Sequence, residues 1–161
     1  MKNQESIRGE IRALIETYFD NASRMSAFVP GKTKVSVGWP IYDHREIISA
    51  VDSLLDLRIS MGPKVATFEN DHADYVGTQH GIAVNSGSSA NLVALAALIH
   101  ADVLEEGAEV IVPSATFTTV LSPILQNGLR AVVVDVEEDT YNIAPSAIEE
   151  AITSDTGLIM P

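Results

Sequence analysis

Ala83–Leu92, with the sequence Ala-Val-Asn-Ser-Gly-Ser-Ser-Ala-Asn-Leu, joins a short apolar run to a Gly-Ser turn and then to a helical pattern. The apolar run predicts a strand over Gly81–Asn85. The residues after the turn predict a helix over about Ser89–His100. Apolar residues at the i, i+3, i+4, i+7 spacing predict a buried face on this helix, and they are Leu92, Leu95, Ala96 and Ile99.

The start of this expected helix has the features of a phosphate cradle. The first backbone N–H groups of a helix have no partner inside the helix, and with the positive end of the helix dipole they favour an anion. Gly87 lets the backbone approach a ligand closely, while Ser88 and Ser89 add hydroxyl groups that donate hydrogen bonds or cap the helix. The same residues also fit an ordinary capped helix after a strand. The loop sequence by itself therefore does not identify a cofactor.

Two familiar phosphate motifs are excluded by spacing. The segment has no G-x-x-x-x-G-K-[ST], and its single Gly87 does not make a G-x-G-x-x-G. Neither a triphosphate site nor a pyrophosphate site is supported. The expected ligand is a single phosphate group.

Length and composition indicate one domain or a large part of one. The chain has 161 residues, of which 46% are hydrophobic, and can bury a core. Residues 156–161 predict a strand after a Gly turn, and a strand that finishes a domain normally has a following partner or cap. We therefore expect the chain to be the N-terminal part of a longer protein.

Charge, cysteine content and hydropathy exclude several classes of protein. The formal net charge of −12 disfavours nucleic acid and anionic membranes as partners. The absence of cysteine excludes a disulfide, a thiolate nucleophile and a Cys-ligated metal within these residues. Four histidines are scattered without helical pairing, so a metal site is not expected. The N-terminus lacks an apolar h-region, and the longest apolar run, Leu92–Ile99, is too short to span a bilayer. We expect a cytoplasmic protein.

Apolar spacing predicts three helices before the Gly-Ser turn. They cover Ser6–Ala22, about 44–57 after an Asp43 N-cap, and about Val65–Val76, with an extended connector over Phe28–Pro40. The residues of the second helix expected to point inward are Ile47, Ile48, Val51, Leu54 and Leu55. We divide the chain into an N-terminal helix with its connector, residues 1–40, and an α/β region, residues 41–161.

Strands and helices then alternate along the chain. This alternation predicts an α/β fold with a largely parallel sheet and helices on its faces. After the strand and helix already described, the expected elements are Glu109–Pro113, Thr116–Gln126, Ala131–Val136, Pro145–Ile152 and Gly157–Met160.

Six short motifs in a fixed order carry a resemblance to a known family. They are Gly62-Pro63, Phe68-Glu69, Tyr75-Val76-Gly77, Asn85–Ala90, Gly107–Ser114 and Thr116–Thr119. Together they resemble the DegT/DnrJ/EryC1/StrS family of pyridoxal-phosphate enzymes of nucleotide-sugar metabolism, which have the aspartate-aminotransferase (type I) fold. The similarity extends from about residue 28 to residue 161.

Three further segments point to one branch of that family. Residues 86–92 and 126–129, with residues 28–33 upstream, look most like the branch of CDP-hexose 3-dehydrases and lipopolysaccharide-synthesis proteins. At Phe117 the chain follows the aminotransferase members instead. The reaction, transamination or 3-dehydration, therefore stays open.

The resemblance implies a cofactor, its ligands and a substrate class. Gly87, Ser88 and Ser89 would hold the phosphate of pyridoxal 5'-phosphate, and Phe117 would stack on its pyridine ring. Residues 41–161 would be an incomplete cofactor-binding large domain. The substrate would be a nucleotide-linked keto-deoxysugar in lipopolysaccharide or deoxysugar biosynthesis. The complete protein would be a homodimer, because the type I fold places its active site at a dimer interface.

The resemblance also implies that part of the catalytic apparatus lies elsewhere. The family needs a carboxylate on the pyridinium nitrogen, and a Lys in aminotransferases or a His in dehydrases. In family order both positions follow Pro161. The 161 residues alone would then be catalytically incompetent.

Several residues have a second interpretation. Phe117 also fits a core aromatic on a helix face. Asp135 ends a Val-rich strand, where it would face a ligand cleft or serve a turn. Trp39 would be a packing anchor or a contact to substrate or a partner subunit. The chain as a whole also fits a non-catalytic phosphate-binding or interaction module of α/β type, which would leave apolar surface in water. We favour the enzyme.

Overall fold

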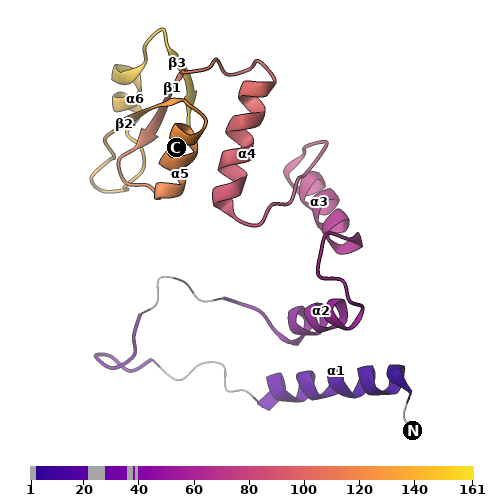
Figure 1. Cartoon of the computed structure of the whole chain (residues 1–161). Helices are drawn as coiled ribbons and strands as arrows, with labels where there is room; N and C mark the ends of the chain where they lie inside the picture. Colours follow the sequence, from indigo (N-terminus) through magenta and orange to yellow (C-terminus); the bar gives the residue numbers. More distant parts are fainter. Residues whose placement is uncertain (1–2, 22–27, 36–37, 39) are drawn as a thin grey trace. The chain divides into compact units, whose positions relative to one another are not determined.

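A computed structural model describes residues 3–21, 28–35, 38 and 40–161 of the chain (Figure 1). Its contacts divide the chain into two compact units, residues 1–79 and 80–161. The elements in chain order are α1 (Gln4–Asn21), α2 (His44–Leu55), α3 (Pro63–Val76), α4 (Gly87–His100), β1 (Glu109–Pro113), α5 (Thr118–Gln126), β2 (Arg130–Val134), α6 (Pro145–Ala151) and β3 (Thr156–Ile159).

The first unit contains the three helices expected from apolar spacing. The predicted Asp43 N-cap of α2 is confirmed: its carboxylate accepts from the Arg45 backbone N–H at 2.8 Å, while the Glu46 side chain accepts from the Asp43 N–H at 2.7 Å. This reciprocal pair is a capping box, which satisfies amides that a helix start leaves open. Between α1 and α2, Arg12 donates to both carboxylate oxygens of Asp52, at 3.3 Å and 3.0 Å.

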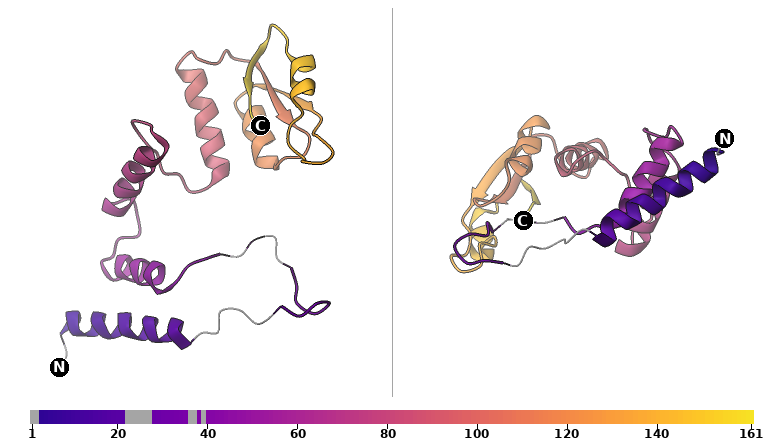
Figure 2. Two further views of the ribbon diagram at one scale, coloured as in Figure 1. Left: turned by 180° about the vertical axis from the view of Figure 1, so that it is seen from behind. Right: turned by 90° about the horizontal axis from the view of Figure 1, so that it is seen from below.

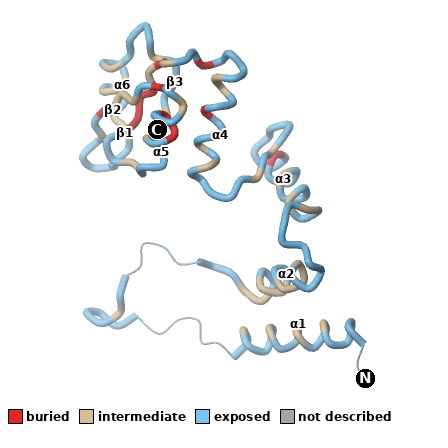
Figure 3. Tube along the Cα trace, viewed as in Figure 1, coloured by how far each residue is buried: buried red, intermediate tan, exposed pale blue. Residues whose placement is uncertain are grey.

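The prediction that apolar residues of α1 and α2 point inward is wrong in part. No residue of α1 or α2, both fully described, is buried, and Leu54 and Leu55 on α2 are 59% and 44% exposed (Figure 3). An apolar stripe predicts a face that needs cover, but these two helices cover only part of each other.

The connector expected over Phe28–Pro40 is described only in part. Residues 36, 37 and 39 lie outside the described residues, so the predicted role of Trp39 does too. In the described part a turn replaces a fully extended path, because the N–H groups of Lys32 and Thr33 both donate to the Val29 carbonyl, at 3.0 Å and 2.8 Å. Gly31 supplies the positive φ of +74° that this turn uses.

The second unit has the predicted parallel α/β sheet. Its described strands lie in the order β2-β1-β3, with Ile111 of β1 beside Val132 of β2 and Ile159 of β3. The chain runs from β1 through α5 to β2 on one side, and then from β2 through α6 to β3 on the other side of β1. Because such crossovers are right-handed, α5 and α6 cover opposite faces of the sheet, as Figures 1 and 2 show.

The core lies between the sheet and the helices on one face. Val110 and Val112 point to that face from β1 and are fully buried, together with Leu95 of α4 and Ile124 of α5. Ile111, between them in the strand, points to the opposite face and is also fully buried. Of the predicted buried face of α4, Leu95 and Ile99 join the core, whereas Leu92 and Ala96 are exposed.

One predicted strand is wrong. Gly81–Asn85 forms no ladder with any described strand, and Ile82 within it is 79% exposed. An apolar run becomes a strand only where another backbone pairs with it. The helix after it is present, but it starts at Gly87 rather than at about Ser89. The remaining predicted elements of this unit are found within two residues of their expected ends.

Candidate functional site

The predicted phosphate cradle is the capped start of α4. Ser86 is the N-cap in extended conformation, and its hydroxyl oxygen accepts from the Ser89 backbone N–H at 3.2 Å. The Ser86 hydroxyl in turn donates to the Ser89 hydroxyl oxygen at 3.2 Å. The Ser89 amide is therefore used by the cap, while the Ser89 hydroxyl keeps its own proton to donate outward.

Two amides at this helix start are open to a ligand. Among the described residues, no hydrogen-bond acceptor meets the N–H groups of Gly87 and Ser88. Gly87 also faces open space, because a Cβ atom built on it meets no heavy atom within 4 Å. The first turn of α4 carries no acidic residue to oppose an anion. The donors, the space and the helix dipole together fit a phosphate group.

Phe117 stands at the start of the next helix, after the carboxyl end of β1. It occupies the N-cap position of α5, and its backbone carbonyl accepts from the Val120 N–H at 2.9 Å. Its side chain is 81% exposed, so the interpretation of Phe117 as a core aromatic is wrong for this structure. An exposed aromatic face is free to stack on a flat ring.

The two segments lie at the same edge of the sheet. In parallel α/β folds, ligands bind at the carboxyl ends of the strands where the order of connections reverses. Here the chain leaves β1 toward β2 and returns to β3 on the other side of β1. Phe117 follows the carboxyl end of β1, four residues after Pro113.

Asn91, one turn into α4, joins these two segments directly. Its side-chain amide donates to the Thr119 carbonyl in the first turn of α5 at 3.1 Å. A second bond lies at the other end of α5, where the Asn127 side chain donates to the Leu92 carbonyl at 3.3 Å. Sequence reasoning did not single out Asn91. The available signal was Pro123 inside α5, because a proline leaves one helix carbonyl without its usual N–H donor, and a side chain such as Asn91 can replace that donor.

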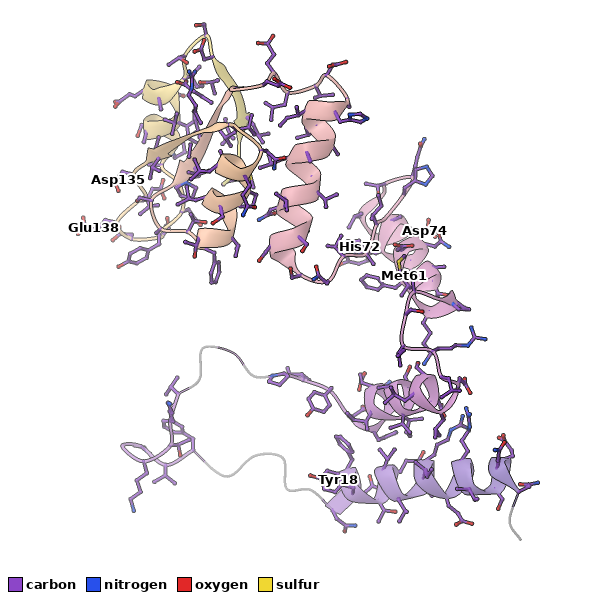
Figure 4. The ribbon with its side chains drawn as sticks, viewed as in Figure 1. Tyr18, Met61, His72, Asp74, Asp135 and Glu138 are labelled. Carbon is purple, nitrogen blue, oxygen red and sulfur yellow. The ribbon has the colours of Figure 1, made fainter. Side chains whose placement is uncertain are left out.

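Asp135 takes the turn role rather than a place in a cleft. Its carboxylate accepts from the Val136 N–H at 2.9 Å, and its carbonyl accepts from the Ala144 N–H at 3.2 Å. Figure 4 labels it in the second unit, with Glu138 nearby. The bond from Ala144 ties together the two ends of the loop after β2, next to the antiparallel bridge between Val136 and Ile143, whereas the bond from Val136 joins neighbouring residues. The Asp135 carboxylate is thus used locally.

A pocket at the opposite edge of the sheet lies away from this site. Its volume is about 540 Å³, and its lining includes Gly107, Arg130 and Thr156, at the amino ends of the three strands. Arg130 pairs there with Asp155 at 2.6 Å and with Glu109 at 3.6 Å. The charge of Arg130 in this pocket is therefore already neutralised by carboxylates. We place the candidate site at the opposite edge of the sheet, where the strands have their carboxyl ends.

Metal ligands and membrane spans were searched for in the described part of the chain. No group of three or more His, Asp and Glu residues there is arranged to hold a metal ion. None of the helices there combines the length and the apolar character that crossing a membrane requires.

Fold and site together define an α/β protein in which a helix start with open backbone amides lies near an exposed aromatic residue. The model of the DegT/DnrJ/EryC1/StrS aminotransferase family matches residues 42–161. The chain belongs to this family, which confirms the resemblance and the fold expected from it.

Similar proteins of known function include enzymes of sugar biosynthesis. The dTDP-4-dehydro-2,6-dideoxy-D-glucose 3-dehydratase of Saccharopolyspora spinosa is 39% identical over 83% of this chain and 30% of its own length. The lipopolysaccharide biosynthesis protein RfbH of Salmonella typhimurium is 36% identical over 96% of this chain and 36% of its own.

A solved structure supports the same relationship. The E. coli GDP-4-keto-6-deoxy-D-mannose-3-dehydratase, solved with bound hydrated PLP, matches with a TM-score of 0.69 and 35% identity. The match covers 76% of this chain and 32% of that one. The chain thus spans about a third of the length of these relatives.

Proposed function

We propose that this chain binds the phosphate of pyridoxal 5'-phosphate at the start of α4 and the cofactor ring on Phe117. The observation that carries the proposal is the pair of open amides, Gly87 and Ser88, held beside an exposed Phe117 at one edge of the sheet. The cofactor bound in the E. coli relative supports the choice of ligand.

Each residue has a separate part in this binding. The Gly87 and Ser88 amides donate to phosphate oxygens, with the positive end of the α4 dipole behind them. The Ser88 and Ser89 hydroxyls add two further donors. Phe117 covers one face of the ring by offset stacking and keeps water from that face.

The bound cofactor supplies an electron sink for carbanion chemistry, which none of these side chains can supply. The residues of this chain bind it and orient its ring. We propose no acid or base among Gly87, Ser88, Ser89 and Phe117, because none of these four residues has a side chain that gains or loses a proton near neutral pH.

We propose that the substrate is a nucleotide-linked keto-deoxysugar. The names of the S. spinosa and E. coli relatives support this class, and RfbH supports a place in lipopolysaccharide synthesis. Two reactions are candidates: 3-dehydration, as in the dehydratases, and amino-group transfer, as in the family name.

Mass spectrometry separates the two reactions. Incubation of the protein, at the length its gene encodes, with GDP-4-keto-6-deoxy-D-mannose and an amino donor yields a sugar product that lacks the C3 hydroxyl group if the protein is a 3-dehydratase. It yields a product with nitrogen in place of the keto oxygen if the protein is an aminotransferase.

We further propose that residues 41–161 form part of the cofactor-binding large domain, that residues 1–40 precede it as helix and connector, and that the complete protein is a cytoplasmic homodimer. The family match over residues 42–161 supports the domain boundary. The homodimer rests on the resemblance to the type I fold. Light scattering of the purified protein tests it.

Cofactor binding is tested by a titration with pyridoxal phosphate followed by visible absorbance. Ser88→Asp places a carboxylate beside the phosphate and is expected to weaken binding at least about tenfold, because two negative charges on a phosphate about 4 Å away repel the carboxylate by about 2 kcal/mol even in water. Ser146→Asp is the matched control: Ser146 is the second residue of α6, as Ser88 is the second of α4. Equal binding by the Ser88→Asp variant and the control contradicts the proposal.

A further inference from the structure

The start of α5 contains a carbonyl that its own helix does not satisfy. In an α-helix each carbonyl accepts from the N–H four residues later. Four residues after Thr119 stands Pro123, which lies inside α5 and has no N–H. The Thr119 carbonyl therefore lacks its intrahelical donor.

Asn91 of α4 supplies that donor from outside the helix. Its side-chain Nδ2 lies 3.1 Å from the Thr119 carbonyl oxygen. Pro123 itself is buried, so the proline fills space on the packed side of α5 while it frees the Thr119 carbonyl about one turn earlier in the helix. A proline in one helix and an asparagine in the other thus make one interhelical connection.

This connection joins the two halves of the candidate site. Asn91 stands one helical turn after Gly87 and Ser88, whose amides face the ligand. Thr119 stands two residues after Phe117, whose ring is exposed. The Asn91 side chain therefore links the helix turn that carries the open amides to the helix turn that follows the aromatic residue.

We infer that Asn91 is a positioning residue for the cofactor and acts through the carbonyl that Pro123 leaves free. The inference rests on the proposed function, because it assumes that Gly87, Ser88 and Phe117 hold one ligand. Thr119 is exposed, so water can replace the lost donor. The bond is therefore expected to matter for geometry rather than for the global stability of the fold.

The first test needs no cofactor and uses the protein at the length its gene encodes. Hydrogen exchange is measured at the Val120 amide, which donates to the Phe117 carbonyl and reports the first turn of α5. Asn91→Ala is expected to speed this exchange about threefold or more. Pro123→Ala restores an N–H to α5, so in that background Asn91→Ala is expected to change the exchange rate less than twofold. An equal effect in both backgrounds overturns the inference.

The second test measures pyridoxal-phosphate affinity and the visible circular dichroism of the bound cofactor. Asn91→Ala is expected to lower the affinity about three- to tenfold and to reduce the dichroic band, and adding Pro123→Ala is expected to recover both. Asn91→Leu keeps the side-chain volume but removes the hydrogen-bond donor, so its affinity and dichroic band are expected to match those of Asn91→Ala. This variant provides the test if a Pro123 variant does not fold.

Asn127→Ala is the matched control for both tests. Asn127 also donates from its side chain across the two helices, to the Leu92 carbonyl, but at the far end of α5 from Phe117. It is expected to leave the dichroic band unchanged. If Asn91→Ala and Asn127→Ala alter the band equally, Asn91 has only a general structural role and the inference is wrong. If the unchanged protein binds no pyridoxal phosphate, the proposed function fails, while the exchange test still decides the hydrogen bond.

Discussion

The side chain of Asn91 in α4 donates to the backbone carbonyl of Thr119 in α5 at 3.1 Å. This bond ties the helix that offers open amides to the helix that begins at Phe117. A ligand with a phosphate at one end and a flat ring at the other can use both segments together. The predictions below follow from this pairing and from the packing around it.

Phe117→Ala is expected to weaken pyridoxal-phosphate binding about two- to tenfold, because an offset-stacked aromatic pair contributes about 0.5–1.5 kcal/mol. The side chain is 81% exposed, so the free energy of unfolding is expected to change by less than about 0.5 kcal/mol. Absorbance titration and urea unfolding measure the two quantities.

Phe68→Ala is the control for Phe117, because Phe68 is an exposed aromatic of the first unit. It is expected to leave the affinity unchanged. A Phe117→Ala variant that binds the cofactor normally but unfolds more easily would show that the ring packs rather than stacks.

The parts of this fold that sequence reasoning predicted are those set by local chemistry. The cap at Asp43 follows from an acceptor side chain before an apolar repeat, with Glu46 three residues later. The parallel sheet follows from the alternation of short apolar runs with helical patterns, and the structure has it. The helix after the Gly-Ser turn follows from the same kind of local signal, although it begins at Gly87, two residues before the predicted start at about Ser89.

The parts that could not be predicted depend on partners distant in the sequence. Gly81–Asn85 has a strand pattern, but no described strand pairs with it. Leu54 and Leu55 have an inward pattern, but α1 leaves them 59% and 44% exposed. The bond from Asn91 to Thr119 joins residues 28 positions apart and depends on a proline in the second helix. Local patterns do not carry such information.

Gly157→Ala is expected to destabilise the second unit by about 1–3 kcal/mol, the usual penalty for overpacking a core. A Cβ atom at this position would lie 2.5 Å from Leu104 Cδ1 and 3.1 Å from Ala108 Cβ, and both neighbours are buried. Urea unfolding of the variant measures the change.

Gly9→Ala gives the opposite sign and serves as the control for Gly157. Gly9 lies inside α1, and a Cβ atom there meets nothing within 4 Å. Ala is expected to stabilise this helix by about 1 kcal/mol, because Gly loses more backbone entropy in a helix. Stabilisation by Gly157→Ala would contradict the packing described for β3.

The cap of α2 is expected to weaken in acid. Hydrogen bonds from the Arg45 side chain and then from its backbone lower the pKa of Asp43 from 3.8 to about 2. A group whose pKa is lower in the folded state stabilises the fold above its ordinary pKa. The contribution is therefore full above about pH 4 and is lost as the pH falls through 3.8 toward 2.

Carboxyl chemical shifts in an NMR titration measure this pKa directly. Asp43→Asn keeps a side-chain acceptor for the cap but cannot titrate, so the pH-dependent shift of the Arg45 amide signal between pH 4 and pH 2 is expected to be smaller in the variant than in the unchanged protein. An Asp43 pKa close to 3.8 would mean that the Arg45 contacts do not form in solution.

The most direct test of the account compares pyridoxal phosphate with pyridoxal, which lacks the phosphate, by measuring the dissociation constant of each. The start of α4 is expected to make the phosphate form bind at least about a hundredfold more tightly, because several charge-assisted hydrogen bonds of about 1.5–3 kcal/mol each act on the phosphate alone. Ser88→Asp is expected to remove most of this difference, and Ser146→Asp to leave it intact. Equal affinities for the two compounds, or a preference that survives Ser88→Asp unchanged, would contradict the assignment of Gly87, Ser88 and Ser89 as the phosphate site.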